Sequence, residues 1–233
     1  MSNNEVAWGT AGDTRVIRAI QHLNRTLPLK KRQTELPKPI ADLHRAILRS
    51  FAERGRPLSN SEIAAFLGSD TSAPGALAIL GANDLVVLSS GNPANVGITG
   101  AYPFTMRETP HKVKVFGQQV HAMCALDALS VAPLFQTETW IESRCHVTGE
   151  PVGIHQKGMT ILEAILADVQ FGVRWQKVEG NAAHGLCKEM VYLKDARTAA
   201  EWRKTDPEAI EIFNLPDALE FGAAFFVPLL DVA

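Results

Sequence analysis

The residues best suited to chemistry in this chain are its cysteines and one aspartate. Cys124, Cys145 and Cys187 are the only cysteines among 233 residues, and Asp127 follows the first of them by three positions. If a helix begins near Cys124, its N-terminus favours the thiolate, and Asp127 lies on the same helical face. The apolar residues around Asp127 would disfavour its charge and leave a neutral, proton-donating carboxyl group. The spacing therefore predicts a thiolate beside a proton donor.

Each of these residues also has an ordinary structural interpretation. An isolated Cys-x-x-Asp is most often a small core residue beside a local cap, and buried free cysteines such as Cys145 and Cys187 commonly fill space. The chain contains no paired Cys-x₂-Cys knuckles, no Gly-x-Ser-x-Gly elbow, and no His-Glu-x-x-His or Walker sequence. A zinc site built from the cysteines with His146, His155 and His184 stays open, although no spacing supports it.

Composition excludes several classes of function. The net charge of −2 gives no overall electrostatic reason to bind nucleic acid or an anionic membrane. No apolar run approaches the roughly 18 residues that span a bilayer, and the first residues lack the pattern of a secretory signal. An odd number of cysteines cannot form a complete set of intramolecular disulfides. We therefore expect a cytoplasmic protein with reduced thiols.

The first hundred residues are predicted to be mainly helical. Residues 1–38 look like a loosely packed or disordered extension, with one amphipathic helix over about 13–27 and a solvated basic cluster at Lys30, Lys31 and Arg32. Apolar spacing predicts helices from about 40 to 55, from 59 or 60 to 68, and from 72 to 80, followed by strands over 85–88 and 97–102. This order is typical of a winged helix-turn-helix. The candidate recognition helix, 70–80, contains no Lys or Arg, which argues against DNA binding.

The second half is mostly β in character. Strands are expected over 111–116, 137–147, 152–155, 173–175 and 189–193, with helices over 125–131, 196–203, 207–213 and 219–230. The predicted fold class is α+β: a winged-helix-like part followed by a mixed or antiparallel sheet with flanking helices. We divide the chain into an extension (1–38), a winged helix-turn-helix-like domain (39–105) and a catalytic α+β domain (106–233).

Three segments together resemble one family. They are Cys124-Ala-Leu-Asp127-Ala-Leu, then Cys145-His-Val-Thr-Gly-Glu-Pro-Val, then Cys187 ahead of Thr-Ala-Ala-Glu-Trp at 198–202. The combination resembles the organomercurial (alkylmercury) lyases over roughly residues 40–225. Met123 departs from the resemblance, since an aromatic residue precedes the first cysteine in a related sequence, and residues before 38 have no counterpart.

The resemblance implies cleavage of carbon–mercury bonds by protonolysis, which yields a hydrocarbon and Hg(II) in mercury detoxification. Cys124 and Cys187 would hold the mercury, Asp127 would manage the proton, and Cys145 would support the site from the core. No organic cofactor is implied. Cellular thiols would release the product, and a mercuric ion reductase is a further possible recipient. The alternative is a winged-helix regulator that senses metal or thiol stress through the three cysteines.

Overall fold

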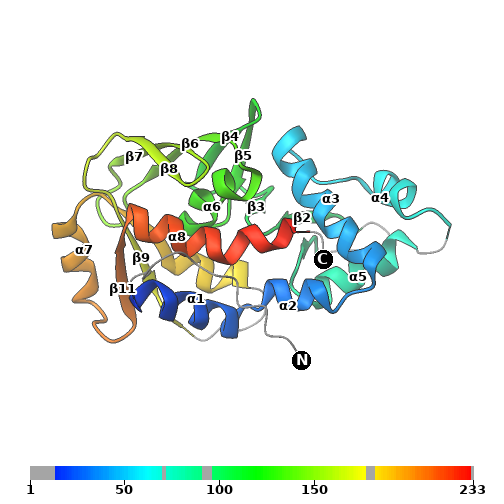
Figure 1. The fold of residues 1–233 in the computed structure, drawn as a ribbon, viewed down its shortest axis with the longest axis horizontal. Coiled ribbons are helices and arrows are strands. Elements are labelled where there is room, and N and C mark those ends of the chain that lie inside the picture. The colour runs from blue at the N-terminus through cyan, green and yellow to red at the C-terminus, as the bar shows by residue number, and fades with distance from the viewer. Residues whose placement is uncertain (1–13, 70–71, 91–95, 177–181, 232–233) are drawn as a thin grey trace.

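An antiparallel sheet of eight strands forms the largest layer of the molecule. The computed structural model describes residues 14–69, 72–90, 96–176 and 182–231 (Figure 1). The strand order is β1-β2-β3-β5-β4-β6-β7-β8. The strands are β1 (Val87–Leu88), β2 (Ile98–Ala101), β3 (Phe104–Thr105), β4 (Lys112–Val115), β5 (Gln118–Ala122), β6 (Glu138–Arg144), β7 (Pro151–Lys157) and β8 (Thr160–Ala164).

Alternating side chains explain why this sheet has one buried face. Buried and exposed residues alternate strictly along β6. Val113 of β4 pairs with Ile141 of β6, which in turn pairs with Ile154 of β7, and all three are fully buried. A period of two places such residues on the same face, so the register forms a continuous apolar row. The helix α6 (Ala125–Phe135), buried over nearly its whole length, packs on that row.

A smaller antiparallel sheet of three strands lies beside the first. Its order is β10-β9-β11, with β9 (Gln170–Arg174), β10 (Met190–Leu193) and β11 (Ile210–Asn214). A parallel bridge between Cys145 and Tyr192 joins the two sheets after β6 ends. The short 3₁₀ turns η2 (Ala182–His184) and η3 (Leu186–Glu189) lead directly into β10.

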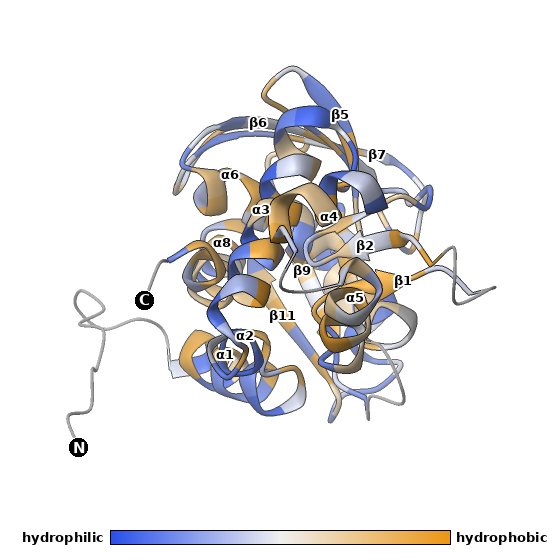
Figure 2. Cartoon of the chain, turned by 90° about the vertical axis from the view of Figure 1, so that its right-hand side faces the viewer, coloured by the Kyte–Doolittle hydropathy of each residue, from blue (hydrophilic) through white to orange (hydrophobic). Residues whose placement is uncertain are grey.

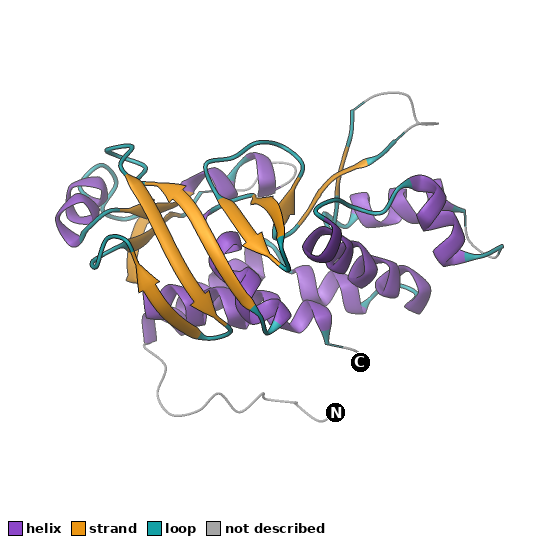
Figure 3. Ribbon diagram, turned by 90° about the horizontal axis from the view of Figure 1, so that it is seen from above, coloured by secondary structure: helices purple, strands orange, loops and turns teal. Residues whose placement is uncertain are grey.

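The other helices of the described residues lie along the sheets and at one end of the molecule, where α3, α4 and α5 gather (Figures 1 and 3). They are α1 (Thr14–Thr26), α2 (Leu29–Thr34), α3 (Lys38–Arg54), α4 (Asn60–Leu67), α5 (Ala73–Ala82), α7 (Ala196–Arg203) and α8 (Leu215–Phe226), and the turn η4 (Val227–Leu230) follows the last. Ser59 caps α4 in a capping box with Glu62, and Gly55 ends α3 at a positive φ of 70°. Within the described ranges, no helix combines the length and apolar character needed to cross a membrane.

The expectation that residues 1–38 pack loosely is wrong for the part the structure describes. The predicted helix is present as α1, and it lies alongside α8 (Figure 1). Val16, Leu23 and Leu29 are almost fully buried in the main core. Arg32 donates to the backbone oxygen of Asn83, so the basic cluster is only partly solvated. The polar composition concealed a narrow apolar stripe that packs on α8. Residues 1–13 lie outside the described part.

The predicted order of three helices and two antiparallel strands is present in α3–α5 and β1–β2. Figure 2 shows α5 drawn largely in the hydrophobic colour, and residues 70 and 71 of the predicted helix lie outside the description. The strands do not form a separate wing, because β2 pairs with β3 and β3 pairs with β5. One core contains residues from all three predicted units. The winged-helix interpretation and the domain division stay predictions.

The helix expected over 207–213 is wrong, because residues 207–209 lie in a turn and Ile210–Asn214 form β11 at the edge of the smaller sheet. Ile210 pairs with Arg174, and Ile212 pairs with Gly172, where the strand register leaves no room for a helix. A short apolar run does not distinguish a strand from a helix by periodicity alone. Strands β3, β5 and β8 were not predicted, whereas the expected strands over 137–147 and 189–193 are confirmed as β6 and β10.

Candidate active site

Cys124, Asp127 and Cys187 come together in the centre of the molecule. One sulfur or carboxylate atom from each lies within 4.8 Å of the other two, and all three side chains are buried. Cys187 is 60 residues from Asp127 in sequence, so the fold creates this juxtaposition. Soft thiolates beside a carboxyl group suit a soft metal centre together with proton transfer.

Cys124 is held at the junction between β5 and α6. Its backbone is extended, with φ −152° and ψ −179°, and it caps the helix: Sγ accepts the backbone N–H of Asp127 at 3.4 Å. The thiol also contacts Sδ of Met190 at 3.8 Å. The helix expected to begin near Cys124 is therefore confirmed as α6, and the cap fixes the position of Cys124 relative to Asp127.

Cys187 lies in the 3₁₀ turn η3, immediately before β10. Cys187 is 7% exposed whereas the neighbouring Lys188 is exposed, so the turn directs the two side chains apart. No strand partner holds residues 182–189, so side chains from other segments must fix the position of Cys187.

Burial dominates the electrostatics of the site. It raises the pKa of Asp127 from 3.8 to about 7, although hydrogen bonding with Cys124 and Cys187 acts in the opposite direction. Burial likewise raises the pKa of the Cys124 thiol well above 9.0. The hydrogen bond with Cys124 lowers the pKa of Cys187, but burial and the charge of Asp127 outweigh it and leave a raised pKa.

The expectation that the helix N-terminus stabilises a Cys124 thiolate is therefore wrong for the resting site. The helix dipole acts over its first turn, but complete removal from water opposes the charge more strongly. The expected neutral carboxyl is confirmed in direction: Asp127 is close to half-protonated at neutral pH. Oδ2 of Asp127 is buried and has no hydrogen-bond partner among the described residues. It is free to exchange a proton with a bound molecule.

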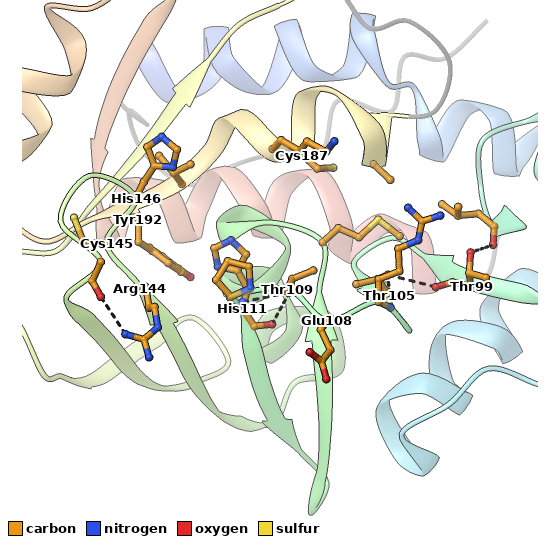
Figure 4. Close-up of a pocket in the computed structure, with 18 residues that line it drawn as sticks. Thr99, Thr105, Glu108, Thr109, His111, Arg144, Cys145, His146, Cys187 and Tyr192 are labelled. Carbon is orange, nitrogen blue, oxygen red and sulfur yellow. Dashed lines mark hydrogen bonds between the residues drawn. The ribbon is translucent and has the colours of Figure 1, made fainter. Parts of the chain in front are cut away.

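Two spaces meet at Cys187. A cavity of about 530 Å³ opens on one side and is lined by Cys187 and Met123, together with polar residues such as His111 and Arg144 (Figure 4). A small inner space on the other side is lined by all three site residues and by apolar side chains in or next to α1, α8 and β10: Leu23, Leu27, Phe225, Phe226 and Met190. Cys124 and Asp127 reach only the inner space. Cys187 is thus the site residue that separates the cavity from the buried pair.

Cys145 lies outside this cluster and in the wall of the larger cavity. Burial disfavours its ionisation, but hydrogen bonds from Thr148 and from the backbone of Thr148, Lys194 and Val147 lower its pKa overall. The residue bridges to Tyr192, whose hydroxyl donates to the backbone oxygen of Ala125 at 2.9 Å. Cys145 is thereby connected to the first residue of α6.

The open possibility of a zinc site gains no support from the described side chains. Nε2 of His155 lies 2.7 Å from Glu138, and its ring stacks on Trp140. His146 packs edge-on against Trp202. Among the described residues, the group with metal-ligand geometry is the Cys124, Asp127 and Cys187 cluster. The side chain of His184 lies outside the description.

Several residues of the site gave no signal in the sequence. Leu23 and Leu27 belong to the segment interpreted as an extension, yet they line the inner space. Tyr102 lines it too, and Met190 contacts the sulfur of Cys124. These residue types carry no motif, and only the packing of distant segments places them here.

Comparisons with known proteins point to one family. A family model described as MerB, alkylmercury lyase, matches residues 104–227. An alkylmercury lyase of Bacillus cereus is 28% identical over 118 residues, which span 51% of this chain and 54% of that protein. The alkylmercury lyase of Pseudomonas putida is 25% identical over 84% of this chain and 88% of its own length. That of Staphylococcus epidermidis is 26% identical over 77% and 79%.

A solved structure shares the fold. The mercury-bound form of MerB2 superposes with a TM-score of 0.70 at 24% identity, over 86% of this chain and 98% of that one. The first curated relative is matched over only about half of its length. The family model nevertheless covers more than half of the present sequence, and its range includes Cys124, Asp127 and Cys187. The chain therefore belongs to the alkylmercury lyase family.

Proposed function

We propose that this protein cleaves the carbon–mercury bond of organomercurials by protonolysis, releasing a hydrocarbon and Hg(II). The observation that carries this proposal is the buried group of two thiols and one carboxyl whose ligand atoms lie within 4.8 Å of one another. Two soft ligands can hold one mercury atom between them. The carboxyl group lies close enough to donate a proton to the carbon attached to that mercury. Membership of the family supports the same reaction.

The first step is capture of the organomercurial R–Hg–X by Cys124. Its sulfur bonds to mercury, X leaves, and the thiol proton leaves with X. The product is a linear S–Hg–R species in an apolar environment, where the C–Hg bond remains strong. Cys187 lies at the boundary between the cavity and the inner space, so it can approach this mercury as the second ligand.

The second step cleaves the bond. Asp127 takes the proton of the Cys187 thiol, and the resulting thiolate bonds to mercury. Two thiolate ligands increase the electron density on carbon. Asp127 then gives the proton to that carbon, and the C–Hg electron pair becomes the new C–H bond. R–H leaves, and Hg(II) remains between Cys124 and Cys187. The carboxyl group ends unchanged, so protons and charges balance.

The pKa of Asp127 suits this double role. A group that acts first as base and then as acid works best when its pKa is close to the working pH, and burial brings that of Asp127 to about 7. The thiols have raised pKa values, so each needs a base when it binds mercury. Exclusion of water from the inner space protects the proton transfer from competition with solvent.

The wider setting follows from the product. Hg(II) held by two protein thiolates needs competing thiols for release, so we propose that cellular thiols remove it and that a mercuric ion reductase can receive it. The proposed reaction uses no organic cofactor. Cys145 is proposed to support the site through Tyr192 rather than to bind mercury. A cytoplasmic location suits three reduced cysteines.

The test is incubation of the protein with an arylmercurial and excess thiol, followed by detection of the free arene. We expect stoichiometric arene from the parent protein. Asp127→Ala should still bind one equivalent of the arylmercurial through Cys124 but release no arene, because no group remains to deliver the proton. Cys145→Ser serves as the control with an intact cluster. Arene release by Asp127→Ala at the parent rate would refute the mechanism.

The regulator alternative is not favoured by the described part of the molecule. Helix α5, the candidate recognition helix, contains no Lys or Arg, and DNA affinity depends largely on cations that contact phosphates. A negative gel-shift at low salt would agree with the enzyme.

A further inference from the structure

The turn that carries Cys187 is held by two polar side chains from another part of the chain. The backbone N–H of Ala182 donates to Oδ2 of Asp84 at 3.3 Å, and that of Ala183 donates to the Tyr102 hydroxyl at 2.9 Å. These are the first N–H groups of η2, which have no partner within the turn. Gly185 and Lys188 then continue the 3₁₀ bonding that contains Cys187. The two side chains therefore act as the cap of this segment.

The capping pair is itself rigidly held. The Tyr102 hydroxyl donates to Oδ1 of Asp84 at 3.1 Å, so each side chain orients the other. Tyr102 is 1% exposed and directly follows β2. Asp84 follows α5 with a positive φ of 52°. Arg32 of α2 lies 3.8 Å from Oδ2 of Asp84 and donates to the neighbouring backbone oxygen of Asn83. Contacts from α2, α5 and β2 thus converge on one turn.

Tyr102 of this pair lies next to the site residues. Tyr102 lines the inner space together with Cys124, Asp127 and Cys187. Burial, followed by the charges of Cys187 and Asp84, raises the pKa of its hydroxyl, which therefore stays protonated and keeps its donor function. Its oxygen is engaged by Asp84 and by the backbone of Ala183, so its contribution to the site is through the turn.

We propose that Asp84 and Tyr102 are positioning residues that hold Cys187 where it can become the second ligand of a mercury atom already bound to Cys124. This inference rests on the proposed function. Cys124 is fixed by the cap of α6, but Cys187 belongs to a segment without a strand partner. Small displacements of a reacting group cause large losses of rate, so the anchor of that segment determines how fast the second Hg–S bond forms.

The first test separates capture of substrate from the chemical step. Tyr102→Phe removes the hydroxyl, and Asp84→Asn replaces the oxygen that accepts from Ala182 with an N–H donor or reorients the amide. We expect each variant to lower kcat for hydrocarbon release at least about tenfold while KM changes less than about threefold, since a misplaced group affects the chemical step. The double variant should be little slower than either single one, because the two residues act as a unit.

A matched control removes a buried hydroxyl elsewhere. Ser50 donates to the backbone oxygen of Arg56 at 2.9 Å and is 4% exposed. Ser50→Ala should lose comparable stability and keep kcat within about twofold of the parent, as expected for a loss far from the reaction. If Tyr102→Phe and Asp84→Asn also keep kcat within about twofold, the positioning role is refuted.

A second readout does not depend on catalysis. Maleimide labelling of the full chain, followed by peptide mass spectrometry, should show Cys187 reacting at least about fivefold faster in Tyr102→Phe, because its turn opens more often. Cys145 provides the internal control and should label at an unchanged rate. An unchanged rate for Cys187 in both variants overturns the inference. If the parent released no hydrocarbon, the proposed function would fail, while this labelling would still decide whether the pair holds Cys187.

Discussion

Replacing Asp127 with asparagine should make the folded protein more stable at alkaline pH while removing its activity. Asparagine has nearly the same size, but it cannot ionise. In the parent, the buried carboxyl must lose its proton against the cost of desolvation as the pH rises. Because the pKa of Asp127 is raised, we expect the gain in the free energy of unfolding of the variant over the parent to increase with pH.

The sign and size follow from that pKa. In the unfolded chain the carboxyl ionises near its ordinary value of 3.8, whereas in the folded protein it ionises near 7. Between these values the folded state binds more protons than the unfolded state, so the parent's free energy of unfolding falls as the pH rises from about 4 to about 7 and is level above that. At 1.36 kcal/mol per pH unit, the loss is about 4 kcal/mol.

Two buried histidines change the free energy of unfolding with pH in the opposite direction. Their effect cancels when the parent is compared with Asp127→Asn. Burial lowers the pKa of His44 and of His111 from 6.5 to about 4. Each therefore costs stability as the pH falls from about 6.5 to about 4, because the unfolded state then binds more protons. This loss is the same in the parent and in Asp127→Asn, so the difference between the two proteins isolates the carboxyl.

The assay is urea unfolding of both proteins between pH 4 and pH 8.5, with excess reductant. We expect the difference in unfolding free energy, variant minus parent, to increase by up to about 4 kcal/mol from pH 4 to pH 8. Any effect of the amide on packing is independent of pH. It therefore shifts the plot of this difference against pH up or down without changing its slope. A difference independent of pH would show that Asp127 ionises normally, and the role assigned to its raised pKa would be refuted.

Four further predictions test the site and its support. Cys187→Ser should still capture an organomercurial through Cys124 but release hydrocarbon about a thousandfold more slowly in single-turnover assays, since the second thiolate is lost. In the parent, kcat/KM should increase with pH through about 7 as Asp127 becomes a base, and a flat profile would contradict this. His44→Leu should lower the free energy of unfolding by about 1–3 kcal/mol, because it leaves buried hydrogen-bonding groups unpaired. Leu23→Ala, on α1, should cost about 2–5 kcal/mol in the same urea assay.

Much of the fold could be predicted because the pattern of apolar and polar residues is clear in a strand or helix that buries only one face. The alternation along β6 and the cap Ser59 before α4 are both present as expected. The segment before residue 38 was misjudged because its buried stripe is narrow and its partner, α8, lies about 200 residues away in sequence. The helix expected over 207–213 was a misjudgement because most of that segment is an edge strand, which is specified by its partner β9, and no local window contains that partner.

The site was predictable only in its chemistry. The resemblance to the organomercurial lyases implied that Cys124, Asp127 and Cys187 act together, whereas each residue taken alone also had an ordinary structural interpretation. The protonation state of the two thiols could not be predicted from the sequence, because it depends on burial. The helix terminus suggested a thiolate at Cys124, whereas the enclosed site keeps both thiols neutral. The groups that hold Cys187 in place were also invisible, because Asp84 and Tyr102 belong to no motif.

A neutral resting site explains how burial and reactivity are compatible in this protein. Two thiolates and a carboxylate within 4.8 Å would repel one another strongly in an environment without water, so the two thiols keep their protons until mercury arrives. A mercury cation supplies the positive charge that makes each thiolate stable, and it does so at the atom where the bond forms. Ionisation therefore accompanies binding, and each thiol needs a proton acceptor at that moment. A carboxylate with an ordinary pKa near 4 would be a poor acceptor for the proton of a thiol. The burial that raises the pKa of Asp127 to about 7 is therefore part of the proposed catalysis as well as a cost to stability.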